Sequence, residues 1–230
     1  MNTFFLTPFR PEKTFGELKT ADKFSAMSLI VLLILMLLNL VLLIPVTEKI
    51  TLITLSSMSL PEGQMDMMIQ TAHTMRYVQI VGSAILYVIM FLFYAFLLYL
   101  LVRLADDNKL EYKKALQLVI FSYFIVAIGD LVNTALIFWR GLDAIKTMYD
   151  VSLTGLNLLT SVEQIGATRY IILSYITPFQ LWFVVLLSIG LKILTDMKWV
   201  KAIIISALFW LITILIPVIS VFLSQVAGGK

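Results

Sequence analysis

Asp130 is the residue whose type and position most strongly indicate chemistry. It is the only acidic or basic residue inside any of the long apolar stretches of the chain, and it lies past the middle of the stretch 115–139. A carboxylate at the centre of a membrane helix costs about 2.5–3.5 kcal/mol on insertion scales, so such residues usually serve a function. Gly129 beside it would let another backbone approach closely.

Three polar residues form the expected surroundings of Asp130. Asn133 and Thr134 follow at the i+3 and i+4 positions, on the same helix face, and Asn39 in another apolar stretch can pair with this face across helices. One interpretation is a proton- or cation-binding site of a small transporter or channel. The other is a polar cluster that fixes helix packing through hydrogen bonds. Both interpretations remain open at this point.

Enzymatic chemistry finds no support elsewhere in the sequence. The chain has no cysteine and one histidine, His73, which excludes thiolate nucleophiles and any metal site with two histidine ligands. The run Ala127-Ile128-Gly129-Asp130 is similar to the aspartate motif of intramembrane aspartyl proteases. Such a site needs two aspartates, and no second one lies in an apolar stretch. We therefore predict no catalytic centre, cofactor, metal ion or nucleic-acid partner.

The composition places these residues in a membrane protein. Hydrophobic residues make up 60% of the 230 residues, and charged residues make up 13%, about half the charged share of a soluble domain. A spanning helix needs about 20 mostly apolar residues. Five stretches reach that length: 24–47, 77–102, 115–139, 170–191 and 202–227. We expect an all-α fold in which residues 1–230 form a single membrane domain, a polytopic bundle of five transmembrane helices in the lipid bilayer.

The positions of Lys and Arg predict the orientation of this bundle. Residues 1–23 and the loops after the second and fourth stretches carry 11 of the 17 basic residues, whereas the longer segments on the other side carry six. Basic residues concentrate in short cytoplasmic segments. The amino terminus is therefore predicted inside and the carboxyl terminus outside.

Two segments outside the apolar stretches have a helical pattern. In residues 1–23, Phe and Leu are interleaved with Arg and Lys, as in an amphipathic segment on the inner membrane surface. In the first outer loop, a helix start at Ser59 precedes apolar residues at helical spacing, and this helix should continue without a break into the second span. Its apolar face consists of Met65, Met68, Ile69 and Met75. This face either packs on the second outer loop, 140–169, or contacts a partner or an apolar ligand.

Pro178 predicts a bend at the start of the fourth span, because a proline within a helix frees a carbonyl one turn earlier. The alternative is an opening toward the outer leaflet beside Trp182. A lipid bound there would indicate a lipid-binding factor of envelope homeostasis.

Several dispersed motifs resemble the bacterial branch of the Yip1 domain family. They are Pro11-x-x-x-Phe15-x-x-Leu18 before the first span, Tyr112-x-x-Ala115-Leu116 at the third, and Thr177-Pro178-Phe179-x-x-Trp182 in the fourth, followed by Gly190-Leu191. The resemblance marks Pro178, Phe179, Trp182 and Gly190 as a structural motif. Two positions depart from the family pattern. Thr177 stands where Asn is frequent, and the third span lacks a frequent central proline.

The resemblance implies a non-enzymatic scaffold or accessory protein of the bacterial plasma membrane that acts through membrane partners. Some bacterial members of the family are associated with ABC-type export systems that protect the cell from toxic peptides. Components of such an exporter are therefore the expected partners.

Overall fold

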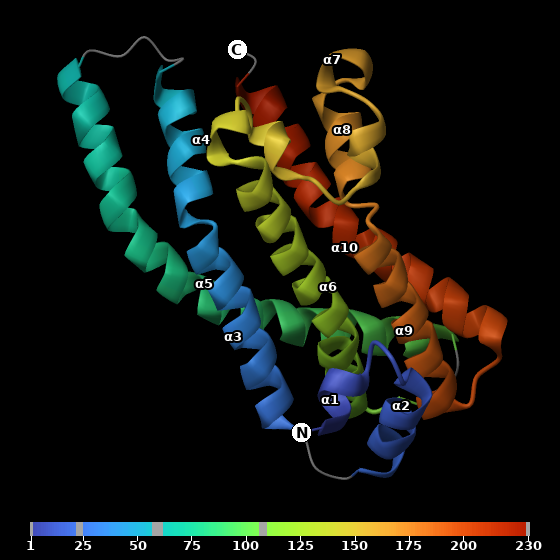
Figure 1. The fold of residues 1–230 in the computed structure, drawn as a ribbon. Helices are drawn as coiled ribbons and strands as arrows, with labels where there is room; N and C mark the ends of the chain where they lie inside the picture. The colour runs from blue at the N-terminus through green and yellow to red at the C-terminus, as the bar shows by residue number, and fades with distance from the viewer. Residues whose placement is uncertain (1, 22–24, 57–61, 106–109, 229–230) are drawn as a thin grey trace.

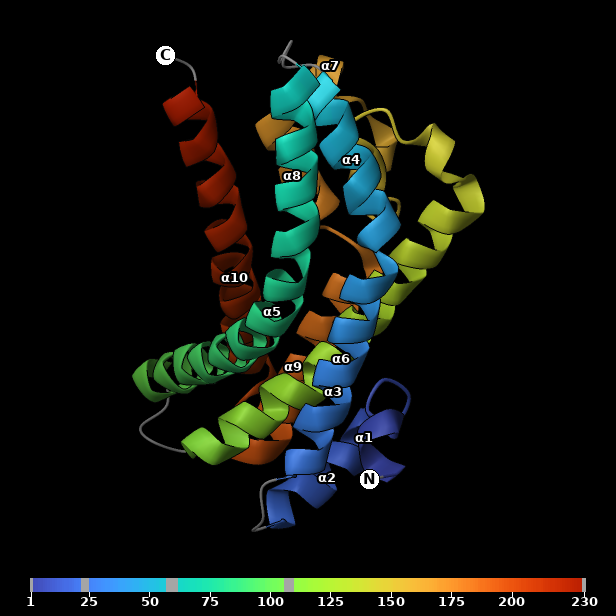
Figure 2. The same ribbon diagram turned by 90° about the vertical axis from the view of Figure 1, so that its left-hand side faces the viewer.

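The computed structural model describes residues 2–21, 25–56, 62–105 and 110–228, and this part of the chain consists of helices and loops without any strand. Figure 1 shows the helices as a bundle with the amino terminus at one end and the carboxyl terminus at the other, and Figure 2 shows the same separation from the side. The predicted all-α class is confirmed.

The first predicted span is a helix that is broken near its carboxyl-terminal end. Helix α3 (Ala26–Leu42) and helix α4 (Ile44–Ser56) meet at Leu43 with a bend of 44°. Pro45 explains the break, because it has no amide hydrogen and its ring clashes with the carbonyl four residues earlier. The helical segment also extends beyond the predicted end at residue 47.

Helix α5 (Glu62–Ala105) joins the first outer helix to the second span without a break, as predicted, and has 44 residues. The predicted start signal at Ser59 lies outside the described residues. Figures 1 and 2 show that α5 curves in its middle, so that its second half runs across the bundle beside α6 (Tyr112–Arg140) and α10 (Trp199–Gly228). This apolar half, Val78–Ala105, has 28 residues, and a helix longer than the bilayer core accommodates the excess by tilting.

The fourth predicted span consists of two helices rather than one. Helix α8 (Ala167–Ser174) ends before the proline, and helix α9 (Pro178–Thr195) begins at it. Thr177 caps α9, since its Oγ1 accepts a hydrogen bond of 3.1 Å from the backbone N–H of Gln180. The expected bend is confirmed as a complete break of the helix.

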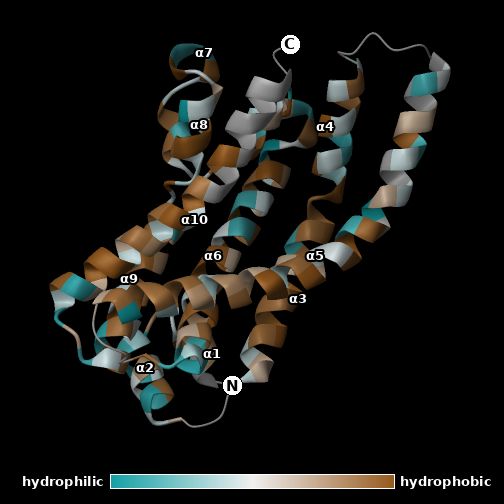
Figure 3. Ribbon diagram, turned by 180° about the vertical axis from the view of Figure 1, so that it is seen from behind, coloured by the Kyte–Doolittle hydropathy of each residue, from teal (hydrophilic) through white to brown (hydrophobic). Residues whose placement is uncertain are grey.

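Several of these helices can cross a membrane. In the described chain, the second half of α5, α6 and α9 are long and apolar enough, and the bent pair of α3 and α4 makes a fourth candidate. Helix α10 contributes the shorter apolar segment Trp199–Leu215. Figure 3 shows hydrophobic residues concentrated along these helices. The count of five spans and their orientation stay predictions.

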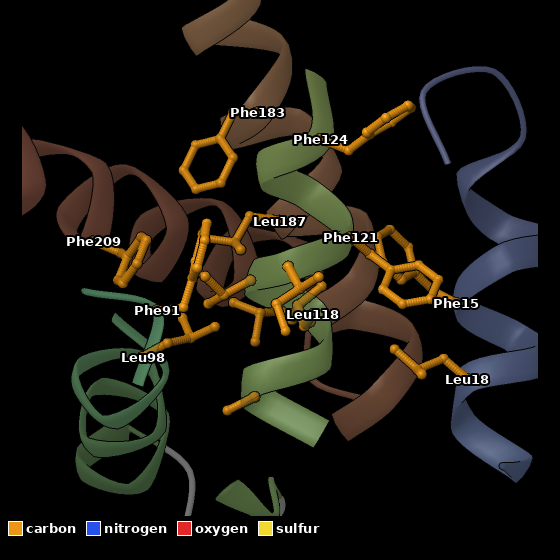
Figure 4. Packing of buried hydrophobic residues seen from close by; sticks show 14 of the residues in the cluster. Phe15, Leu18, Phe91, Leu98, Leu118, Phe121, Phe124, Phe183, Leu187 and Phe209 are labelled. Carbon is orange, nitrogen blue, oxygen red and sulfur yellow. The ribbon is translucent and has the colours of Figure 1, made fainter. Parts of the chain in front are cut away.

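The amino-terminal helices α1 (Asn2–Leu6) and α2 (Pro11–Thr20) belong to the hydrophobic core. The side chains of Phe4, Phe15 and Leu18 are buried, and Figure 4 shows Phe15 and Leu18 pointing from α2 toward α6. The prediction that this apolar face lies on the membrane surface is therefore wrong, because α6 and α9 cover it. Phe9, at 79% exposure, still faces outward.

Basic residues at the amino-terminal end of the bundle bind helix termini. Lys114 Nζ donates hydrogen bonds to the carbonyls of Leu18 (2.5 Å) and Ala21 at the end of α2. Lys201 Nζ donates to the carbonyl of Ala105, the last residue of α5, at 3.1 Å. Ammonium groups stabilise helix carboxyl termini because the last carbonyls lack backbone partners.

Candidate functional site

A polar cavity of about 350 Å³ lies between α6, the second outer loop and the break between α8 and α9. A second cavity of about 270 Å³ extends from it toward α5 and α10. Both are lined by Tyr123 of α6 and by Tyr175 and Gln180, which stand on either side of the helix break. The two cavities are therefore adjacent, and these three side chains lie between them.

Asp130 is the only Asp, Glu, Lys or Arg among the described residues that line either cavity. It lies ten residues before Arg140 at the end of α6, which is about 15 Å along the helix. The side chain is exposed in the first cavity and makes no hydrogen bond or ion pair with any residue that the structure describes. Its carboxylate is thus open to a ligand.

Asn133 does not interact with Asp130 but holds the second outer loop. Its Nδ2 donates to the carbonyl of Val151 at 2.8 Å, and its Oδ1 accepts from the N–H of Leu153 at 2.7 Å. One amide thereby satisfies both a carbonyl and an N–H of the loop backbone. Val151 in turn lines the cavity, so Asn133 positions part of the cavity wall.

Thr134 and Asn39 form a contact between helices. Thr134 Oγ1 donates to Asn39 Oδ1 at 2.7 Å, which joins α6 to α3. The predicted cross-helix partnership of Asn39 therefore exists, but with Thr134 rather than with Asp130. Of the four predicted site residues, only Asp130 and Asn133 line the cavity.

The second outer loop is fixed to the helix break by its backbone. It contains the short helices η1 (Leu142–Ala144), η2 (Met148–Val151), η3 (Leu156–Leu159) and α7 (Val162–Ile165). The N–H of Leu156 donates to the carbonyl of Ile176 at 3.1 Å, within the break itself. A Cβ at Gly155 would lie 2.6 Å from the carbonyl oxygen of Ser174, so only glycine permits this close approach.

Asp150 stabilises the start of η2 at the rim of this loop. Its carboxylate accepts hydrogen bonds from the N–H groups of Lys146 (3.0 Å) and Thr147 (2.8 Å) and from Thr147 Oγ1 (3.1 Å). Partial burial acts to raise the pKa of Asp150, but these hydrogen bonds and the positive charge of Arg140 lower it more, so the pKa lies below its usual value.

The motif at the start of α9 packs this helix against α6. A Cβ at Gly129 would lie 2.5 Å from Cγ and 2.7 Å from Cβ of Phe179. Position 129 must therefore be glycine, because any larger side chain would collide with Phe179 of α9. Because Phe179 also lines the cavity, the same contact shapes the wall next to Asp130.

The remaining motif residues connect α9 to the amino-terminal segment. Trp182 Nε1 donates to the carbonyl of Pro8 at 3.2 Å. A Cβ at Gly190 would collide with Leu118 of α6 and lie 3.3 Å from the ring of Phe15. Each residue of the motif therefore has a packing or capping role on α9.

The predicted outer surface on α5 is uncovered in the structure. Met68 and Met75 are 44% and 52% exposed, and Ile69 is half-buried. The side chain of Met65 lies outside the described part of the chain. The outer half of α5 instead faces α4, where Arg76 Nη1 forms an ion pair with Glu48. The expectation that the second outer loop covers Met68 and Met75 is therefore wrong.

Two tyrosines of the cavity, Tyr123 and Tyr175, were not among the predicted site residues. Tyr123 precedes Asp130 by seven residues, two helical turns, and this spacing places both on one face of α6. Tyr175 and Gln180 flank Pro178, but only the folded chain shows that the helix break faces α6. In the described chain, no group of three His, Asp or Glu residues is arranged to hold a metal ion.

Comparison with known proteins identifies one match. The family model of the Yip1 domain matches residues 5–221. No curated protein and no solved structure matches the chain significantly.

Proposed function

Because the chain belongs to the Yip1 domain family, a family of membrane-trafficking and scaffold-type proteins rather than enzymes, we propose that it is a non-enzymatic scaffold that binds other membrane proteins. In this proposal the protein lies in the bacterial plasma membrane. It binds components of an ABC-type exporter that removes toxic peptides. Residues 1–230 act as one membrane domain in this proposal.

The proposed topology has five spans with the amino terminus inside. The apolar helices and the separation of the two termini at opposite ends of the bundle support it. Since the sequence has no cysteine, single cysteines can test it without a background. A membrane-impermeant maleimide should label Gln70→Cys in intact cells and Thr20→Cys only after permeabilisation. The opposite labelling pattern would refute the orientation.

The scaffold proposal rests on the length of α5 and on the exposed methionines of its outer half. Helix α5 is about 66 Å long along its axis at 1.5 Å per residue, whereas the hydrocarbon core is about 30 Å thick. Part of it therefore projects beyond the bilayer in the proposed topology. Met68 and Met75 are exposed there, and flexible methionine side chains suit an adaptable protein contact.

Site-specific crosslinking tests whether this surface binds a partner. A photoreactive amino acid at Met68 or Met75 should crosslink to the permease subunit of a co-expressed exporter in intact cells. Gln70 is exposed on nearly the opposite face of the same helix and is the matched control position. Equal crosslinking at Gln70, or none at Met68 and Met75, would contradict the scaffold proposal.

The cavity at Asp130 supports a second candidate function, a small proton- or cation-coupled transporter. An ionisable residue within a span that makes no hydrogen bond or ion pair with a described residue is typical of ion pathways. Asp130→Asn should then abolish proton- or cation-dependent flux in proteoliposomes while the protein remains folded. Full flux in this variant would exclude the transport mechanism.

A further inference from the structure

The cavity at Asp130 contains a carboxyl group for which its described walls provide no positively charged partner. Among the residues that the structure describes, no Lys, Arg or His lines either cavity, and Asp130 has no ion-pair partner. An unpaired carboxylate within a membrane helix is costly. A cationic ligand would remove this cost, because an opposite charge within a few ångströms stabilises the charged carboxylate.

The walls are poorly suited to a metal ion. Calcium takes six to eight oxygen ligands and magnesium needs six in octahedral geometry. The cavity offers one carboxylate, and the side-chain oxygen of Asn133 is already engaged by the N–H of Leu153. Hydroxyl and amide groups such as that of Gln180 can orient a ligand but do not add charge.

The walls are suited to an organic cation because three aromatic side chains contribute to them. Tyr123, Tyr175 and Phe179 line the first cavity together with Asp130. The ring of Tyr123 lies 5.9 Å from the ring of Phe183, which continues the aromatic wall into the second cavity. Aromatic faces attract alkylated ammonium groups by cation–π interaction, and they also contact the carbon atoms of such ligands.

We propose that this cavity binds an alkylammonium group, with Asp130 opposite the positive charge and with Tyr123, Tyr175 and Phe179 around the carbon atoms. Its volume of about 350 Å³ lies at the lower end of the range of about 300–1,000 Å³ for ligand pockets. The ammonium group belongs either to a lipid headgroup or to a soluble amine. The proposal is independent of the scaffold function and requires binding only, without transport.

Binding is tested with the full-length protein in nanodiscs made of phosphatidylglycerol, which has no ammonium group. The probe is tetramethylammonium chloride, compared with sodium chloride at equal ionic strength. A saturable rise in the midpoint temperature of unfolding is expected, because a ligand that binds only the folded state stabilises it. No saturable rise in the wild-type protein would overturn the proposal.

Three variants make the test specific. Asp130→Asn keeps the shape of the side chain and should abolish the rise. Glu163→Gln removes one negative charge from an exposed position on α7 and should respond as the wild type does. Tyr175→Leu retains the carboxylate and should weaken binding at least tenfold. It provides a second test if Asp130→Asn does not fold. A response of Asp130→Asn equal to that of the wild type would overturn the proposal.

The two sources of the ammonium group are distinguished by lipid composition. If phosphatidylethanolamine in the nanodiscs shifts the tetramethylammonium titration to higher concentrations, the lipid headgroup occupies the cavity. If the titration is unchanged, the ligand is a soluble amine. Both outcomes support an ammonium site, whereas the Asp130→Asn result decides whether the site exists.

Discussion

Gly129→Ala tests whether close packing between α6 and α9 shapes the cavity. The added Cβ would lie 2.7 Å from Cβ of Phe179 and 2.5 Å from its Cγ. Rotation of the Phe179 side chain can move its ring but not its Cβ, which is fixed by the backbone of α9. The two helices must therefore separate by several tenths of an ångström or more.

Two opposing effects determine how much Gly129→Ala changes the free energy of unfolding. Inserting a methyl group into a packed core costs about 1–3 kcal/mol. Replacing glycine by alanine within a helix stabilises it by up to about 1 kcal/mol. Gly82→Ala in α5 is the matched control, since its Cβ would meet no atom within 4 Å. The difference in unfolding free energy between the two variants therefore isolates the clash, and we expect Gly129→Ala to be less stable by about 1–3 kcal/mol.

The assay is reversible unfolding in mixed micelles, followed by circular dichroism for both variants. A double-mutant cycle with Phe179→Gly adds a direct check, because this change removes all three atoms that approach position 129 most closely. The penalty of Gly129→Ala should disappear in that background. Equal stability of Gly129→Ala and Gly82→Ala, or a penalty that persists when Phe179 is glycine, would show that Phe179 does not cause the clash.

Three further changes test the elements around the cavity and at the amino-terminal end of the bundle. Lys114→Met should remove about 0.3–2 kcal/mol of favourable interaction with the end of α2 and speed proteolysis of the amino-terminal segment, whereas the exposed Lys198→Met should not. Asn133→Ala leaves a carbonyl and an N–H of the outer loop unpaired, at about 1–3 kcal/mol for each buried group, so hydrogen exchange at Leu153 should accelerate. The pKa of Asp150 is lowered in the folded loop, so its stabilising effect is complete above the unfolded value of about 3.9 and is lost as the pH falls through the folded value. Loop protection against hydrogen exchange should therefore decrease below about pH 4 in the wild type, and Asp150→Asn should abolish this pH dependence.

Local sequence patterns predicted the features that depend on local physics. The apolar stretch 115–139 corresponds closely to α6, because every residue needed to form a spanning helix lies within the segment itself. The spacing of Asp130 and Asn133 correctly placed both on the cavity side of α6. Pro178 correctly marked a helix interruption, since proline acts on its own backbone whatever the tertiary structure is.

The features that the sequence could not predict depend on which surfaces meet. An amphipathic pattern around Phe15 is the same whether lipid or another helix covers the apolar face, and here α6 and α9 cover it. Likewise, Asn39 can pair with any polar residue at its depth, and only the packing of α3 against α6 selects Thr134. The exposure of Met68 could not be foreseen either, because it depends on the curvature of α5 and on the position of the second outer loop.

The amino-terminal segment also lies deep along α6. Phe4 packs against Phe124 of α6 with ring centroids 4.6 Å apart. Phe124 lies nine residues beyond the start of the predicted third span, about 14 Å along the helix. In the proposed topology, α1 therefore lies within the inner half of a core about 30 Å thick.

At this depth the backbone of the segment needs hydrogen-bond partners from the protein. The carbonyl of Phe4 accepts from Thr7 Oγ1 at 2.8 Å, and that of Leu6 accepts from the N–H of Arg10 at 2.7 Å. The carbonyl of Pro8 receives the indole N–H of Trp182. An unsatisfied carbonyl in hydrocarbon costs several kcal/mol. In the proposed topology, Trp182 therefore provides the hydrogen bond that a water molecule provides to a turn on the surface of a soluble protein.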